Sequence, residues 1–276
     1  MSRFFGEHMG SFHVSKAKLG VSIAFATGWT DALCYIRYSC FGTMMTGNSL
    51  VMARELSQHG LKATAIIPAV AIICYIVGGL IYKTADHYRK NRISLLAPIV
   101  CILFIATDVV ANLRPQDPLH RKWHVWLIAV AMGIVNGVSA IVDGHTTNAV
   151  TGNYQKFSFA LFDNFCKKPL DSKERFKAKV TAAIIVAFLT GMGVGILVLN
   201  ALVEAHKQGY IDLVDLSFIP VGFIFAGLLI AHDYLDPPHK KEPLLNVGVH
   251  KEGGGRPSGR RPLFCCVRAA SPAAEI

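Results

Sequence analysis

The chain has 276 residues, of which 52% are hydrophobic and 17% are charged, and its mean hydropathy is +0.40. This composition excludes an ordinary soluble globular domain and predicts an all-α polytopic membrane protein. The formal net charge of +10 does not indicate nucleic-acid binding, because the basic residues flank apolar segments and do not gather on one soluble surface.

Six apolar stretches come close to the roughly 20 residues that a helix needs to cross a bilayer. In chain order, these predicted spans are residues 18–37, 63–82, 93–113, 124–142, 178–203 and 213–232. Residues 1–17 precede them as an N-terminal cytoplasmic segment that lacks the apolar core of a signal peptide. Residues 233–276 follow as a basic tail, whose Gly and Pro content predicts disorder.

The distribution of basic residues predicts the orientation in the membrane, since Lys and Arg in short loops stay on the cytoplasmic side. With six spans and the N-terminus inside, 21 of the 28 Lys and Arg residues fall on that side. We therefore expect both termini in the cytoplasm and take the plasma membrane as the default location.

A Thr-Gly-Asn triplet occurs twice, in "TMMTGN" at residues 43–48 and in "NAVTGN" at residues 148–153. At an offset of 105 residues, seven positions around the two triplets are identical, and Asp31 falls on Asn136. This self-similarity predicts an internal duplication, with a first membrane repeat at 18–113 and a second at 124–232.

Three spans in each repeat are an odd number, so the two repeats would have opposite orientations in the membrane. Inverted repeats of this kind are common in transporters and channels, where equivalent polar segments meet near the midplane. In this interpretation each triplet interrupts regular helix geometry, and its Asn caps a short half-helix, at 49–57 and at 154–162. The two helix starts would face a shared cavity.

An alternative has eight spans, in which residues 40–57 and 144–162 also cross the membrane and the repeats of four spans are parallel. Small residues and Thr or Asn side chains also serve as ordinary helix-packing contacts in bilayers. We favour six spans, because eight would move the dense basic loop at residues 83–92 to the outside.

The segment "GWTDALCYIRYSCFGTMMTGN" resembles the signature of the YoaK-like family of multi-pass membrane proteins. Its pattern of Gly-x-x-Asp-Ala, an apolar stretch, a Phe and Thr-Gly-Asn is matched by Gly28, Asp31, Ala32, Phe41, Thr46, Gly47 and Asn48. A weaker second motif is matched by Gly133, Asn136, Thr147 and residues 151–153. The resemblance covers about residues 18–232 and implies a membrane protein without an established activity. The basic tail, its Cys pair and His145 depart from the family pattern.

Polar residues within or beside the spans are the candidate functional residues, because an ionisable group inside a membrane is costly unless it faces water, a partner or a cation. Asp31 is the strongest, with Tyr35 one turn later as a possible hydrogen-bond partner or an interfacial aromatic. Asp108 either has a role in the membrane or is solvated near its surface. The full set predicted to bind solute or line a cavity is Asp31, Tyr35, Thr46, Gly47, Asn48, Asn136, Asp143, His145, Thr147, Asn148, Thr151, Gly152 and Asn153.

Three classes of function fit these observations. A transporter or channel for a small polar or ionic solute comes first, and a non-transporting scaffold or lipid-interacting membrane protein is the alternative. An intramembrane enzyme has the least support, because no nucleotide-binding loop, zinc signature or nucleophile turn is present. No catalytic residue, metal centre or cofactor is predicted. The partners expected are the bilayer and a small solute.

Adjacent cysteines in the tail form a separate candidate site. Cys265 and Cys266 lie among arginines, and S-acylation together with this basic patch would hold the tail on the membrane. The unmodified alternative is a pair of free thiols in a loose tail.

Overall fold

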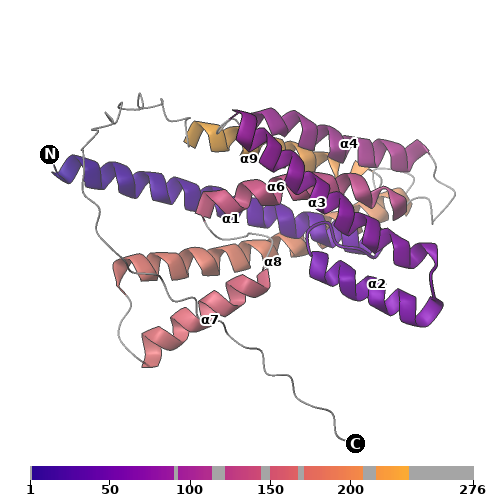
Figure 1. Ribbon diagram of the computed structural model, residues 1–276, viewed down its shortest axis with the longest axis horizontal. Coiled ribbons are helices and arrows are strands. Elements are labelled where there is room, and N and C mark those ends of the chain that lie inside the picture. Colours follow the sequence, from indigo (N-terminus) through magenta and orange to yellow (C-terminus); the bar gives the residue numbers. More distant parts are fainter. Residues whose placement is uncertain are drawn as a thin grey trace, which may run out of the picture. The chain divides into compact units, whose positions relative to one another are not determined.

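The computed structural model describes residues 2–89, 93–113, 122–143, 150–166, 171–207 and 216–235 (Figure 1). Within these ranges the chain forms eight α-helices and one 3₁₀ helix, without a strand. The all-α prediction is therefore confirmed for the part of the chain described.

The first half of the chain folds as α1 (Ser2–Tyr38), α2 (Met45–His59), α3 (Ala63–Arg89), the 3₁₀ helix η1 (Ile93–Leu96) and α4 (Ala97–Leu113). The second half folds as α6 (Val125–Asp143), α7 (Val150–Cys166), α8 (Ser172–Lys207) and α9 (Ile219–Leu235). Helix α1 begins well before the predicted span, so most of the predicted N-terminal segment is helical and belongs to α1.

Several of these helices have the character of membrane spans. Four are long and apolar enough to cross a bilayer, namely Ala17–Tyr38, Ala63–Tyr88, Ile93–Leu113 and Glu174–Ala205. Two shorter apolar helices, Val125–Ser139 and Ile219–Tyr234, coincide with the other two predicted spans. Large apolar side chains are exposed on the outer faces of α3 and α8, including Ile73, Ile76, Leu80, Val186, Leu189 and Leu197, as expected where a helix faces lipid.

Close helix crossings at glycines hold α1 against α8. A Cβ atom on Gly28 would lie 2.0 Å from the carbonyl oxygen of Phe188, and one on Gly191 would lie 2.0 Å from the carbonyl oxygen of Phe25. The two backbones are therefore in direct contact, which is how small residues let membrane helices pack tightly. Any larger residue at either glycine would push the helices apart.

Helices α3 and α6 cross in the same manner. A Cβ atom on Gly78 would lie 2.1 Å from the carbonyl oxygen of Val130, and one on Gly133 would lie 2.1 Å from that of Tyr75. The α1/α8 and α3/α6 pairs make the most extensive helix contacts of the described chain, and they frame the bundle on which the other helices pack.

Helices α4 and α9 pack against each other and complete the core. The ring of Phe104 on α4 lies 5.6 Å from that of Phe225 and 6.2 Å from that of Phe218, measured between centroids. All three side chains are fully buried. Helix α4 also contacts α6, and α9 also contacts α1, so this pair closes the bundle across both halves.

Helix α2 is short and is not among the apolar helices. Its 15 residues extend about 22 Å at 1.5 Å per residue, less than the roughly 30 Å of a bilayer's hydrocarbon core. It packs on α3 and ends at Gly60, which has a φ of 69° and donates its N–H to the carbonyl of Leu56 at 3.1 Å. Helix α7 packs on α8 in the second half and is likewise absent from the apolar set.

Candidate functional site

The segment between α1 and α2 is held by the side chain of Asp31, the strongest sequence candidate. Asp31 is fully buried in α1. Its carboxylate accepts the backbone N–H of Thr43 at 2.9 Å and also the hydroxyl of Thr43. Charge-assisted hydrogen bonds of this kind are about twice as strong as neutral ones. Asp31 therefore fixes the chain where it turns from α1 towards α2.

A second clamp on the same segment comes from Asn48, which is also fully buried. Its side-chain amide donates to the carbonyl of Phe41 at 2.8 Å, and its carbonyl oxygen accepts the N–H of Phe41 at 2.7 Å. The thiol of Cys40 donates to the same oxygen at 3.1 Å. Asn48 thus satisfies backbone groups of Phe41 that lie outside the helices, and burying such groups without a hydrogen bond would be costly.

The predicted capping role of Asn48 is wrong. Helix α2 begins at Met45, and Met44 holds its N-cap position without a side-chain cap bond. The triplet lies within the first turn of the helix and does not interrupt it. Gly47 is required for a different reason, because a Cβ atom there would lie 2.8 Å from two ring carbons of Phe41.

The remaining candidates of the first motif do not form a polar site. Tyr35 is 51% exposed and stacks on the ring of Phe41 with 4.9 Å between the ring centroids, while the Asp31 carboxylate accepts hydrogen bonds from Thr43. Thr46 is exposed. The structure therefore brings Asp31 and Asn48 to one segment, residues 39–44, and leaves Tyr35 and Thr46 at its surface.

The second motif is described only in part. Asn136 is half-buried in α6, and its backbone carbonyl accepts the hydroxyl of Ser139 at 2.9 Å. Asn153 is buried in the first turn of α7, where Gly152 is half-buried. His145, Thr147, Asn148 and the tail cysteines Cys265 and Cys266 lie outside the described residues, as do the side chains of Asp143 and Thr151.

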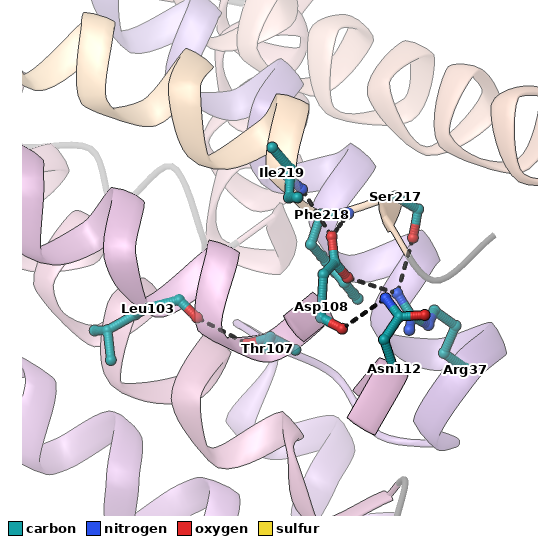
Figure 2. A network of polar contacts seen from close by, with 8 residues as sticks. All are labelled: Arg37, Leu103, Thr107, Asp108, Asn112, Ser217, Phe218 and Ile219. Carbon is teal, nitrogen blue, oxygen red and sulfur yellow. Dashed lines mark hydrogen bonds and ion pairs between the residues drawn. The ribbon is translucent and has the colours of Figure 1, made fainter. Parts of the chain in front are cut away.

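A buried ion pair joins three helices at the end of α1 (Figure 2). The guanidinium of Arg37 donates to Asp108 on α4 at 3.0 Å and to the hydroxyl of Ser217, just before α9, at 2.9 Å. The side chain of Arg37 is 10% exposed and that of Asp108 is fully buried. Arg37 also lies 4.9 Å from the ring centroid of Phe218, a cation–π distance.

Asp108 also caps helix α9 from a neighbouring helix. Its second carboxylate oxygen accepts the backbone N–H groups of Phe218 at 2.8 Å and Ile219 at 2.9 Å (Figure 2). These are among the amides that a helix start leaves unsatisfied, and the partial positive charge there favours a carboxylate. The alternative that Asp108 is merely solvated is therefore wrong.

Sequence reasoning missed Arg37, the last residue of the first predicted span, which entered only the count of basic residues outside the cytoplasm. The available signal was an Arg at the end of one apolar stretch together with an Asp inside another, because charges in a membrane usually pair with one another. The sequence does not show which two charges meet, since Arg37 and Asp108 are 71 positions apart.

A small cavity of about 110 Å³ lies beside the ion pair, between the end of α1, helix α2 and the start of α3. Charges of both signs lie on its wall, from Glu55 of α2 and from Lys122, which precedes α6. The described residues that line it are Tyr38, Ser39, Val51, Glu55, Thr64, Ile67, Pro68 and Lys122. Arg37 lies over the ring of Tyr38, at 5.5 Å from its centroid, so the cavity and the ion pair adjoin.

The volume and lining of this cavity limit what it can hold. At roughly 30 Å³ per water molecule, about 110 Å³ accommodates three or four waters or a solute of similar size. The hydroxyl of Thr64 is buried without a hydrogen-bond partner among the described residues. No group of three or more metal-ligating side chains occurs in the part of the chain that the structure describes.

Comparison with known proteins identifies a family and no activity. The family model described as "Protein of unknown function (DUF1275)" matches residues 19–208, which is more than half of the chain and is consistent with the YoaK-like resemblance. Neither a curated protein nor a solved structure matches the chain.

Proposed function

We propose that this chain, which belongs to the DUF1275 family of proteins of unknown function, is a transporter or channel for a small polar or ionic solute. The observation that carries the proposal is the cavity with Glu55 and Lys122 on its wall, next to the buried Arg37–Asp108 pair. Ionisable groups inside a membrane bundle are rare and mark solute or ion pathways by default.

A reciprocal arrangement of α4 and α9 supports inverted repeats. Asp108 on α4 accepts the N–H groups of Phe218 and Ile219, and Asp233 on α9 accepts those of Ile93 and Ser94 at 3.0 and 2.8 Å. Phe218, Ile219 and Asp233 each lie 125 positions after Ile93, Ser94 and Asp108, respectively. Each helix therefore begins beside the end region of the other, so these equivalent helices are antiparallel.

The glycine crossings repeat with the same logic. Gly28 and Gly133 are separated by the 105 residues of the sequence repeat, as are their neighbours Phe25 and Val130. The partner positions Gly78 and Gly191 are 113 residues apart, as are Tyr75 and Phe188. Helix α1 thus corresponds to α6, and α3 corresponds to α8. A pseudo-two-fold axis that exchanges the halves would superpose the α1/α8 contact on the α6/α3 contact.

Antiparallel equivalent helices favour six spans over eight. Parallel repeats of four spans would make α4 and α9 run in the same direction, whereas inverted repeats of three make them antiparallel. Helices α2 and α7 then enter the membrane without spanning it, which agrees with the finding that neither is one of the six apolar helices described above. In Figure 1 they run outward in opposite directions from the middle of the bundle.

In this arrangement the cavity is the outer end of a pathway between the halves. Residues of α1, α2 and α3 contribute most of its wall, and Lys122 contributes from the segment leading into α6. With the cytoplasmic N-terminus expected from the basic residues, the end of α1 and the start of α3 face outward. A solute would meet Glu55 and Lys122 first and the Arg37–Asp108 pair next.

The alternative, a membrane scaffold that transports nothing, has a specific observation in its favour. The carboxylates of Asp31 and Asp108 and the amide of Asn48 all bond to groups within the chain. Polar side chains used in this way stabilise helix packing and need no solute.

Solute uptake in proteoliposomes decides between the two. In a panel of small ions and polar metabolites, we expect at least one solute to accumulate in the proteoliposomes to a higher level than in protein-free liposomes. Glu55→Gln and Lys122→Gln should each slow that uptake about tenfold or more, because each removes a charge-assisted hydrogen bond to the solute. The double variant Glu204→Gln/Lys207→Gln, which removes an exposed ion pair on α8, is the matched control and should transport normally.

One outcome would contradict transport itself, and another would contradict the proposed pathway through the cavity. One is that no solute in the panel moves faster than through protein-free liposomes, although the protein is folded and inserted. The other is that uptake survives unchanged in both cavity variants, which would place the pathway elsewhere. The first outcome favours the scaffold.

A further inference from the structure

An open groove lies between the first turns of two spans, away from the cavity described above. Its volume is about 520 Å³, and it runs between α1 and α8 close to where their apolar segments begin, at Ala17 and Glu174. Most of its wall is apolar or methylene surface. Its lining is Ala17, Lys18, Val21 and Ser22 from α1, with Phe176, Lys179, Val180 and Ala183 from α8.

This groove and the mixed-charge cavity occupy equivalent places in the two halves. Val180 of the groove corresponds to Ile67 of the cavity at the offset of 113, and Ala17 corresponds to Lys122 at the offset of 105. In the first half, Val51 and Glu55 of α2 line the space. In the second half, no described residue of α7 lines the groove. Among the described residues, α2 therefore covers the cavity in the first half, and α7 gives the groove no corresponding cover.

The charges on the groove indicate what takes the place of this cover. Lys18 and Lys179 are both exposed, one on each wall, and no acidic residue is among the described residues that line the groove. The chain's own tail is a poor occupant, because residues 240–268 carry seven Lys and Arg residues and would be repelled. The occupant should combine an apolar body with a negatively charged head.

We propose that the groove binds an anionic phospholipid, with an acyl chain against the apolar wall and the phosphate between Lys18 and Lys179. Both spans begin on the cytoplasmic side in the six-span and in the eight-span topology. That leaflet holds the anionic lipids, and basic pockets between helices on that side bind their headgroups. The proposal requires membrane insertion and does not depend on transport.

Lipid retention by the purified full-length chain tests the site. Detergent-solubilised protein is mixed with dioleoyl phosphatidylserine or dioleoyl phosphatidylcholine, and bound lipid is counted by native mass spectrometry across a titration. We expect phosphatidylserine to be retained preferentially. Lys18→Gln/Lys179→Gln should weaken its binding about 30-fold, or about fivefold for each lysine.

Two further variants separate the groove from general surface attraction. Lys62→Gln/Lys207→Gln removes two exposed lysines outside the groove and should leave the preference unchanged. Ala183→Phe fills the groove without changing charge and should reduce retention of both lipids. A folded Lys18/Lys179 variant that binds phosphatidylserine like the wild type would overturn the proposal. So would an Ala183→Phe variant with normal retention of both lipids.

Discussion

The Arg37–Asp108 pair offers the sharpest test of how this bundle is held together, because the fold contains its own matched control. Asp108→Asn keeps the size of the side chain and one acceptor oxygen for the N–H groups of Phe218 and Ile219. It removes the negative charge opposite Arg37. Asp233→Asn makes the same chemical change at the equivalent cap of η1, where Ile93 and Ser94 donate.

The expected cost differs between the two sites because Asp108 pairs with a buried guanidinium at 3.0 Å, whereas Asp233 contacts the imidazole of His232 at 3.3 Å. Removing one partner of a buried ion pair costs about 3–5 kcal/mol, since the other charge stays buried and uncompensated. Asp108→Asn removes this carboxylate partner from Arg37, whose side chain is 10% exposed. Loss of a helix cap alone costs about 0.5–2 kcal/mol. Asp108→Asn should therefore destabilise the protein by about 2 kcal/mol or more beyond Asp233→Asn.

The double variant Arg37→Met/Asp108→Asn isolates the charge. Replacing a buried ion pair by uncharged groups of similar size is often neutral or stabilising, so this variant should be more stable than Asp108→Asn alone. Free energies of unfolding can be measured by SDS titration in mixed micelles, followed through the fluorescence of the three tryptophans. Equal losses for Asp108→Asn and Asp233→Asn, or a double variant less stable than Asp108→Asn, would refute the reasoning.

Four other predictions concern topology, the triplets and the tail. In a cysteine-free background, Leu61→Cys should react with an impermeant thiol reagent outside intact cells and Tyr88→Cys should not, and the reverse pattern would indicate eight spans. Asn48→Ala should lower the free energy of unfolding by about 2 kcal/mol in micelles, because it leaves both backbone groups of Phe41 without their partner. If Asn48 and Asn153 serve one pathway, Asn48→Ala and Asn153→Ala should each reduce solute uptake, and the double variant should take up little less than either single variant. Strictly additive losses of stability, with uptake in proportion to the amount of folded protein, would instead show that the triplets are packing elements. Replacing the Cys265–Cys266 pair by Ser should abolish an acyl-exchange signal without affecting insertion, and absence of any signal in the native protein would remove the lipidation hypothesis.

Local composition was sufficient to predict the helical class and the position of the apolar segments. A membrane imposes a length and a hydropathy on each span, and both are properties of contiguous residues. The six predicted stretches therefore coincide with six apolar helices, and α2 and α7 appear as the short helices expected after the two triplets. Both helices are longer at each end than predicted: α2 is Met45–His59 where 49–57 was expected, and α7 is Val150–Cys166 where 154–162 was expected.

The role of Asn48 shows where local reasoning failed. An Asn at the start of a helix is a common cap, so the sequence favours that role. The alternative partner, the backbone of Phe41, is seven positions earlier and becomes available only because Gly47 lets the ring of Phe41 pack against the helix. Asn48 could cap the helix or bond to the backbone of Phe41, and the packing of the Phe41 ring favours the second role.

The amino-acid sequence by itself determined the class of protein, its apolar helices and its repeated Thr-Gly-Asn triplets, because these depend on the character of neighbouring residues. Only the tertiary structure decided that Arg37 pairs with Asp108 and that the carboxylate of Asp233 accepts a backbone N–H of η1. Partners 71 and 140 positions apart are chosen by how helices cross, and the crossings at Gly28 and Gly133 depend on backbones meeting at a single point. A charge in one span does not specify which other span will neutralise it until that packing brings the two together.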